Sequence, residues 1–137
     1  LWKAHGLDNI LREAWEQGVV MAGLSAGSIC WYEASLTDSF GLPVRPIHDG
    51  LGLIPGSHCP HYDSEEGRRL MYHDLVGSGV LPPGLAAEDG VALRYEGTEL
   101  VEVVTSRPGC QGWRVGRDEN GTVIEALSAR LLPAVPR

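Results

Sequence analysis

The chain has 137 residues, which is enough for one domain that buries about two-thirds of its unfolded surface. Its apolar content of 43% and charged content of 21% are ordinary for a soluble globular protein. The net charge of -7 argues against nucleic acid and anionic membranes as partners, and no apolar run approaches the roughly 20 residues that cross a bilayer.

An amphipathic helix is predicted at the start of the chain. Its apolar residues recur at helical spacing on one face: Leu7, Ile10, Leu11, Ala14 and Trp15. Gly18 is placed to end this helix, and the apolar run 19–22 predicts a buried strand directly after it. A helix that feeds into a strand with no strand before it is the second half of a βαβ unit. We therefore expect a domain whose N-terminal strands are missing.

The pentapeptide Gly23-Leu24-Ser25-Ala26-Gly27 separates this predicted strand from a stretch, 29–34, that we expect to continue a helix. It reads G-x-S-x-G in the strand–turn–helix context of a nucleophile elbow. The turn is so tight that the positions two before and two after the serine must be nearly free of side chain, and Gly23 and Gly27 fill both. Ser25 is therefore the candidate nucleophile. The alternative is a structural serine in an ordinary tight turn.

Loops, short strands and one helix are predicted for the middle of the chain. Residues 37–41 predict a loop, and the Gly- and Pro-rich stretch 43–60 predicts short strands and turns around 51–54. Asp63 and Glu66 form a capping-box pattern that predicts the start of a helix. The buried stripe and the end of that helix are assigned to Leu70, Met71, Leu75, Val76 and Gly77.

The C-terminal third is rich in strands. Residues 91–95 and 100–104 are joined by a turn at Glu96-Gly97, and residues 113–115 and 122–125 are joined through Asn120-Gly121, a strong hairpin signal. These elements predict an α/β fold with β-hairpins at its C-terminal end.

A serine nucleophile needs a base, and His61 has the best setting among the five histidines. Pro60 fixes its approach, a predicted helix follows it, and it comes after Ser25 in the chain. The alternative is a loop histidine that only precedes the helix cap.

The cysteines and histidines predict neither a metal nor a cofactor. Cys30, Cys59 and Cys110 are odd in number and lack C-x-x-C spacing, which favours free thiols and a cytoplasmic location. The close grouping of ligand types in 58–63 suits no common zinc arrangement.

Three segments, taken in order, resemble one protease family: Gly23-Leu24-Ser25-Ala26-Gly27-Ser28, Pro60-His61-Tyr62, and Ala87-Glu88-Asp89-Gly90 before a strand. From Leu1 to about Glu125 the chain resembles peptidase E, the aspartyl dipeptidase family of serine peptidases (family S51). The resemblance implies the fold of class I glutamine amidotransferases, a three-layer α/β domain with a mostly parallel sheet and flanking helices. Those amidotransferases carry cysteine at the elbow, so Ser25 favours peptidase chemistry.

The resemblance implies a role for each matching residue. Ser25 is the nucleophile and His61 the general base. Asp89 aligns with the family's glutamate and is the acid that orients His61. Because aspartate is one methylene shorter, Glu88 is the alternative. The N–H of Ala26 belongs to the oxyanion hole. The family's second oxyanion donor comes from a Gly-rich loop that would precede Leu1. We therefore expect an N-terminally short domain and a homo-oligomer that shields the exposed sheet edge.

For substrate binding, the resemblance implies an arginine downstream of His61 that selects an N-terminal aspartate, and Arg68 and Arg69 are the candidates. Their spacing from the histidine is shorter than in the family. They are equally explained as partners of preceding acids, or as ligands for a C-terminal carboxylate. Asp63 is a candidate for binding a free α-amino group, and Asp38 for lining the cleft.

The sequence thus predicts a single peptidase E-like domain, 1–137, that hydrolyses short peptides without a cofactor. We expect a serine exopeptidase with an acyl-enzyme intermediate, either a dipeptidase or a carboxypeptidase. Two alternatives stay open. One is an esterase or amidase using the same serine, and the other is a non-catalytic, amidotransferase-like oligomerisation or binding domain.

Overall fold

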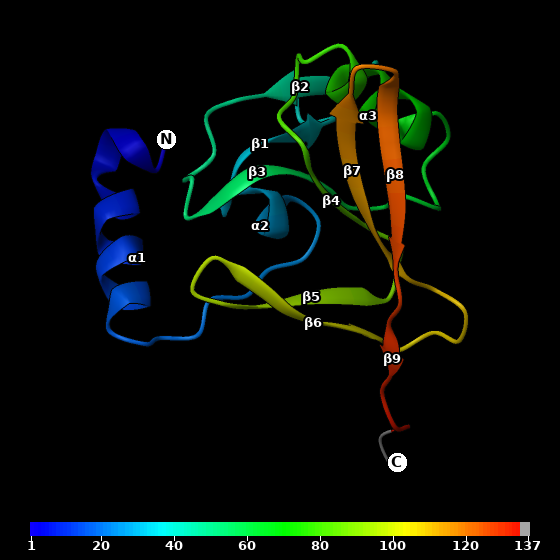
Figure 1. The fold of residues 1–137 in the computed structure, drawn as a ribbon. Helices are drawn as coiled ribbons and strands as arrows, with labels where there is room; N and C mark the ends of the chain where they lie inside the picture. Colours follow the sequence, from blue (N-terminus) through cyan, green and yellow to red (C-terminus); the bar gives the residue numbers. More distant parts are fainter. Residues whose placement is uncertain (135–137) are drawn as a thin grey trace.

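The computed structural model describes residues 1–134, which form an α/β fold (Figure 1). The helices are η1 (Lys3–His5), α1 (Leu7–Glu16), α2 (Ala26–Ile29) and α3 (Arg68–Gly77). The strands are β1 (Tyr32–Thr37), β2 (Arg45–Ile47), β3 (Ile54–Cys59), β4 (Gly84–Ala87), β5 (Val91–Glu96), β6 (Glu99–Thr105), β7 (Gly112–Asp118), β8 (Gly121–Leu127) and β9 (Arg130–Leu131). The α/β class expected from the sequence is confirmed.

A six-stranded sheet in the order β2-β1-β3-β4-β7-β8 carries the candidate site. Its three central strands β1, β3 and β4 are parallel, and antiparallel strands extend both edges. The carboxyl ends of neighbouring parallel strands meet at the same edge of a sheet, which is where α/β folds bind ligands. The residues that follow β3 and β4 are therefore brought side by side, although a helix separates them in sequence.

A second, three-stranded sheet has the order β5-β6-β9 and lies below the first in Figure 1. The predicted hairpin at Glu96-Gly97 is confirmed as β5–β6, and the hairpin near Asn120-Gly121 is confirmed as β7–β8. In the second hairpin the turn consists of Glu119 and Asn120, and Gly121 begins β8.

The core lies between α3 and the larger sheet. Helix α3 packs on β7 and β8, and its Tyr72 and Val76 are fully buried. The side chains of Leu36, Cys59 and Val115 meet them from the sheet. Burial of each large apolar side chain contributes about 1.5–3 kcal/mol, so this cluster fixes α3 and the two strands that it connects.

Two expectations about the elbow region are wrong. The helix after Ser25 ends at Ile29, and β1 begins at Tyr32 instead of a helix continuing to Ala34. Strand β1 pairs with both β2 and β3 and buries side chains on both faces, so tertiary pairing overrides the local helical pattern. The apolar run 19–22 forms no strand in the described chain, and Val20 is 88% exposed. An extended segment becomes a strand only where a neighbour completes its hydrogen bonds, and none pairs with it within residues 1–134.

Helix α1 confirms the predicted N-terminal helix, and Gly18 after it has the expected positive φ of 87°. Its apolar face is not buried, however, and Ile10 is 61% exposed. In Figure 1 the helix stands apart from both sheets.

The capping-box prediction is also wrong. Helix α3 begins at Arg68 after Gly67, whose φ is 75°, and the carboxylate of Asp63 is used elsewhere. The predicted end at Gly77 is confirmed, while Leu70 from the expected buried stripe is 67% exposed. No helix of the described residues has the length and apolar character needed to cross a membrane.

Candidate active site

Ser25 lies at the tip of a strained turn. Its φ of 52° and ψ of -122° are unusual for a residue with a side chain, and such conformations persist only when the surroundings enforce them. The carbonyl of Ser25 accepts hydrogen bonds from the N–H groups of Ser28 and Ile29, and from the hydroxyl of Ser28 at 2.7 Å. These bonds fix the backbone and leave the Ser25 hydroxyl free to point away from α2.

The two glycines of the elbow differ in what they do. A Cβ on Gly23 would lie 1.9 Å from the carbonyl oxygen of Gly27, so no side chain fits at position 23. A Cβ on Gly27 would meet nothing within 4 Å. Only Gly23 is therefore required by the close approach of the two backbone segments.

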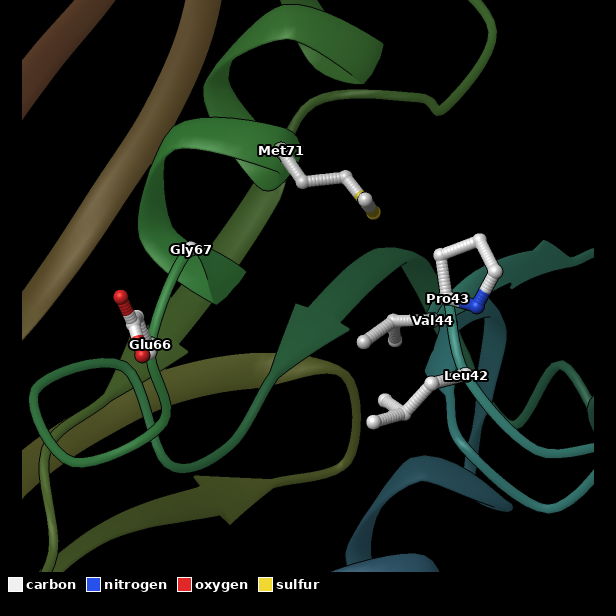
Figure 2. A pocket seen from close by; sticks show the side chains of 6 residues that line it. All are labelled: Leu42, Pro43, Val44, Glu66, Gly67 and Met71. Carbon is white, nitrogen blue, oxygen red and sulfur yellow. The ribbon is translucent and has the colours of Figure 1, made fainter.

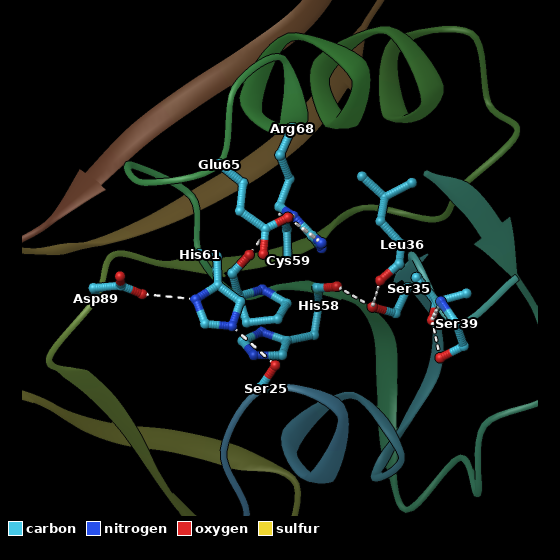
Figure 3. A network of polar contacts seen from close by, with 12 residues as sticks. Ser25, Ser35, Leu36, Ser39, His58, Cys59, His61, Glu65, Arg68 and Asp89 are labelled. Atoms are coloured by element: carbon cyan, nitrogen blue, oxygen red, sulfur yellow. Dashed lines mark hydrogen bonds and ion pairs between the residues drawn. The ribbon is translucent and has the colours of Figure 1, made fainter. Parts of the chain in front are cut away.

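His61 reaches Ser25 from the carboxyl end of β3. Its Nε2 lies 2.9 Å from the Ser25 Oγ, across 36 residues of sequence (Figure 3). Pro60 precedes it, and its own φ of 56° is again positive for a non-glycine residue. Both partners of this contact are thus held in strained backbone conformations, which is a feature of functional sites.

Asp89 completes the contact chain from the carboxyl end of β4. Its Oδ1 lies 2.8 Å from the Nδ1 of His61. The hydrogen bonds that it accepts from His61 and Ser64 hold the pKa of Asp89 below its ordinary value. An ionised carboxylate only accepts, so the Nδ1 of His61 carries the proton and Nε2 is left free to accept the hydrogen of the Ser25 hydroxyl.

The backbone of Asp89 is tied to the His61 segment by Asp63. The N–H of Asp89 donates to the Asp63 Oδ1 at 2.8 Å, and Arg107 donates to the carbonyl of Asp89 at 3.3 Å. Asp63 follows His61 by two residues, so one short side chain connects the two loops that carry His61 and Asp89. Sequence reasoning missed this role because nothing in the local pattern indicates which residue 26 positions away will face Asp63.

Glu88, the alternative acid, points away from His61. It accepts hydrogen bonds from the Nε1 of Trp113 at 2.9 Å, the N–H of Gln111 at 3.0 Å and the guanidinium of Arg69 at 3.5 Å. Among the described residues, Asp63, Glu88 and Cys110 place ligand atoms within 4.8 Å of one another. Both carboxylates already accept hydrogen bonds from protein groups, which accounts for the grouping without an ion.

The predicted substrate-binding residues lie outside the cavity beside Ser25. Arg68 is 3% exposed and ion-paired with Glu65, while the Arg69 guanidinium lies 4.3 Å from the ring centre of Tyr62. Asp38 lies on an exposed turn after β1. Substrate roles for these residues and for Asp63 stay predictions, and the geometry instead ties Arg68, Arg69 and Asp63 to neighbouring protein groups.

A cavity of about 990 Å³ opens next to Ser25 and His61. Three of its lining residues were not singled out by the sequence: Tyr32 from β1, His58 from β3 and Tyr95 from β5. A smaller hollow of about 460 Å³ lies between the 42–44 loop and the start of α3 (Figure 2). Its lining is mainly apolar and includes Met71 and Val44, with Glu66 as its one ionisable residue, so it offers no partner for a nucleophile and base.

Ala26 is the first residue of α2, directly after Ser25. The N–H groups of a first helical turn have no acceptor inside the helix. This N–H is therefore available to a negative charge that develops beside the Ser25 Oγ.

Comparison with known proteins places the chain in a family. The family model for peptidase family S51 matches residues 1–103. An uncharacterized peptidase, YgaJ, from Bacillus subtilis (strain 168) is 51% identical over 115 residues, which are 84% of this chain and 49% of YgaJ. The chain thus spans about half the length of this relative. The elbow, the His61 turn and the Asp89 turn all lie within the matched region, and the chain belongs to peptidase family S51.

Proposed function

We propose that the protein is a serine exopeptidase that hydrolyses short peptides through a Ser25–His61–Asp89 triad. The observation that carries the proposal is the unbroken chain of contacts from the Ser25 Oγ through His61 to the Asp89 carboxylate, at 2.9 and 2.8 Å. Nucleophile, base and orienting acid within hydrogen-bond reach of one another are the signature of covalent catalysis.

In the first half of the reaction, the Ser25 Oγ attacks the carbonyl carbon of the scissile peptide bond while the Nε2 of His61 takes its proton. The carbonyl oxygen becomes an oxyanion, and the N–H of Ala26 donates to it. The negative charge of Asp89 stabilises the doubly protonated ring of His61. The tetrahedral intermediate collapses when the C–N bond breaks and His61 gives its proton to the leaving amine.

In the second half, water attacks the acyl ester on Ser25. His61 takes a proton from the water, and the ester C–O bond breaks as the same proton returns to the Ser25 Oγ. The products are the two peptide fragments, and the protein returns to its starting protonation state without any cofactor.

The size of the cavity supports short substrates. Its volume of about 990 Å³ is at the upper end of small-molecule sites, which suits a di- to tetrapeptide better than a folded protein. The three cysteines are free thiols, which supports the proposed cytoplasmic location.

A homo-oligomer is part of the proposal. Leu1, which precedes the first helical turn, and Ile10 on α1 are 92 and 61% exposed and lie outside the cavity lining, and a second copy packed against this helix would remove their apolar surface from water. Analytical ultracentrifugation tests this directly, and a monodisperse monomer at micromolar concentration would contradict it.

Two assays test the catalytic proposal. A fluorophosphonate probe should label Ser25, and a di- to tetrapeptide panel that includes Asp-X dipeptides should be cleaved, as followed by mass spectrometry. Ser25→Ala should lose both, while the matched control Ser78→Ala, an exposed serine at the end of α3, should keep both. Labelling without peptide cleavage would favour the esterase or amidase alternative. Absence of labelling in the folded protein would favour a non-catalytic domain.

A further inference from the structure

Three rings form a fixed wall of the cavity beside Ser25. Tyr32 and His58 stack with ring centres 4.6 Å apart and an interplanar angle of 11°. Tyr95 meets Tyr32 edge-on at 6.1 Å and 79°, and the two tyrosine hydroxyls are 2.9 Å apart. This contact joins the six-stranded sheet to the three-stranded sheet, so the wall is in place before any ligand binds.

His58 contributes a neutral ring to this wall. Its Nδ1 lies 3.0 Å from the carbonyl oxygen of Leu85, and because a carbonyl only accepts, Nδ1 carries the hydrogen. Burial lowers the pKa of His58 to about 4, against the opposing effect of that hydrogen bond. At neutral pH the ring is therefore uncharged. Because Tyr32 and His58 are each only 4% exposed, they support the wall from behind, and the half-buried Tyr95 presents its accessible ring.

The charged groups of the lining disfavour an anionic ligand. Arg94 is the single arginine or lysine that lines the cavity within residues 1–134, and it donates to Glu96 at 2.8 Å and to Glu102 at 3.3 Å. Glu88, Asp89 and Glu96 line the cavity as well. A ligand carboxylate would thus meet more acids than bases, and the one guanidinium is already paired.

The remaining surface near the rings is apolar and includes Trp31, Ile54 and Leu93. We propose that this cavity binds an apolar side chain, an aromatic one most tightly, of the residue whose carbonyl Ser25 attacks. That the bound side chain belongs to the residue attacked by Ser25 rests on the proposed function. The preference of the cavity for apolar side chains does not. Removing an aromatic side chain from water and packing it edge-on or offset against the half-buried Tyr95 ring favours phenylalanine, whereas aspartate would lose hydration without gaining an ionic partner. The aspartate preference expected from the family resemblance would then not hold for this chain.

Ligand binding to the Ser25→Ala protein tests the inference without requiring catalysis. The probes are the N-acetyl amides of L-phenylalanine, L-leucine and L-aspartate, titrated at neutral pH and followed by NMR chemical shifts. We expect affinity to fall in that order, with phenylalanine at least about tenfold tighter than aspartate. Equal binding of all three, or tighter binding of the aspartate derivative, would overturn the inference.

Two variants of Tyr95 locate the binding surface. In the Ser25→Ala background, Tyr95→Ala should remove the preference for phenylalanine, because the edge-on ring is lost. Tyr95→Phe keeps the ring and loses only the hydroxyl, so the preference should survive. Retention of the full preference in a folded Tyr95→Ala protein would place the apolar site elsewhere and overturn the assignment. If Tyr95→Ala fails to fold, the comparison of phenylalanine with aspartate in the Ser25→Ala protein, which keeps Tyr95, still tests the inference.

Failure of this inference and failure of the proposed function give different results. If wild-type protein resists the fluorophosphonate but the Ser25→Ala protein prefers phenylalanine, the catalytic proposal fails and the cavity assignment holds. If Ser25 is labelled and the cavity prefers aspartate, the catalytic proposal holds and the cavity assignment fails.

Discussion

The two sides of the candidate active site are held by different means. His61 and Asp89 follow neighbouring parallel strands, and the two segments are joined by the Asp63–Asp89 bond at 2.8 Å and by the Tyr62 N–H donating to the Ala87 carbonyl at 3.1 Å. Ser25 follows a segment that is exposed and pairs with no strand in residues 1–134. The sheet therefore positions the base and the acid, whereas the nucleophile depends on the local backbone conformation of the elbow.

Loss of the acid on the sheet side should have the largest effect. In Asp89→Asn the amide keeps the shape, but its NH₂ can donate to the Nδ1 of His61 and so place the ring hydrogen on Nε2. His61 then cannot accept the Ser25 proton, and we expect turnover to fall on the order of 10⁴-fold. The rate of ester hydrolysis, measured together with the melting temperature, separates this effect from unfolding.

Glu88→Gln is the matched control, because Glu88 is the neighbouring acid and points toward Trp113 instead of His61. We expect its rate to fall less than tenfold. If Glu88→Gln lost as much activity as Asp89→Asn, the assignment of the orienting acid to Asp89 would be wrong.

On the elbow side, Gly23→Ala should disable the nucleophile. The new Cβ would lie 1.9 Å from the Gly27 carbonyl oxygen, so the turn must open and displace the Ser25 hydroxyl. A displacement of about 1 Å at a reacting group can reduce the rate about 100-fold, and this is the loss we expect in fluorophosphonate labelling.

Gly27→Ala tests whether that loss reflects the close approach and not glycine in general. Its Cβ would have open space, so labelling should stay within a few-fold of wild type, contrary to the sequence-based expectation that both glycines are needed. Equal losses in the two variants would show that the elbow is not organised as described.

The buried His58 makes stability on the sheet side depend on pH. Its folded pKa of about 4 lies below the ordinary 6.5, so the unfolded chain binds a proton more readily between these two values. Stability should thus be greatest above pH 6.5 and decline as the pH falls toward 4, by at most about 3 kcal/mol from this residue.

Urea unfolding at pH 7.0 and 4.5 measures this decline, with His58→Gln as the control. Glutamine can still donate to the Leu85 carbonyl but does not titrate in this range, so its decline should be smaller than that of wild type. Identical declines in the two proteins would mean that His58 titrates normally in the folded state.

Local sequence signals predicted the elements whose structure depends on local bonds. The two hairpins follow from their turn residues, and α1 follows from its 3.6-residue periodicity. The resemblance to peptidase E implied that Ser25, His61 and Asp89 act together. They do lie in contact, although their catalytic roles stay a prediction.

Features that depend on partners distant in sequence were not predictable in the same way. Residues 29–34 have a local pattern that favours a helix, but pairing with β2 and β3 makes residues from Tyr32 onward a strand. The apolar run 19–22 has the composition of a buried strand, yet composition alone does not supply a pairing neighbour. The ring wall of Tyr32, His58 and Tyr95 draws on three strands in two sheets, so it depends on strand order and register that no single segment encodes.

The smallest expected effect concerns Asp63, which connects the loops of His61 and Asp89. Asp63→Ala leaves the Asp89 N–H without this acceptor, which loosens the carboxylate that orients His61. Loss of a hydrogen bond to a charged group corresponds to about 1.5–3 kcal/mol, and because this bond is exposed we expect roughly a tenfold lower kcat, near the lower end of that range. KM should not change, because Asp63 contacts the turn and not the cavity.

Asp63→Asn distinguishes this positioning role from the earlier prediction that Asp63 binds the substrate's α-amino group. Asparagine keeps a carbonyl oxygen that can accept from the Asp89 N–H, so kcat should recover most of the loss seen in Asp63→Ala. If Asp63 instead binds the α-amino group of the substrate, its negative charge is needed. Both variants remove that charge, so both would raise KM. Recovery of kcat by asparagine at constant KM therefore supports a loop-connecting role, and a shared rise in KM would assign Asp63 to the substrate.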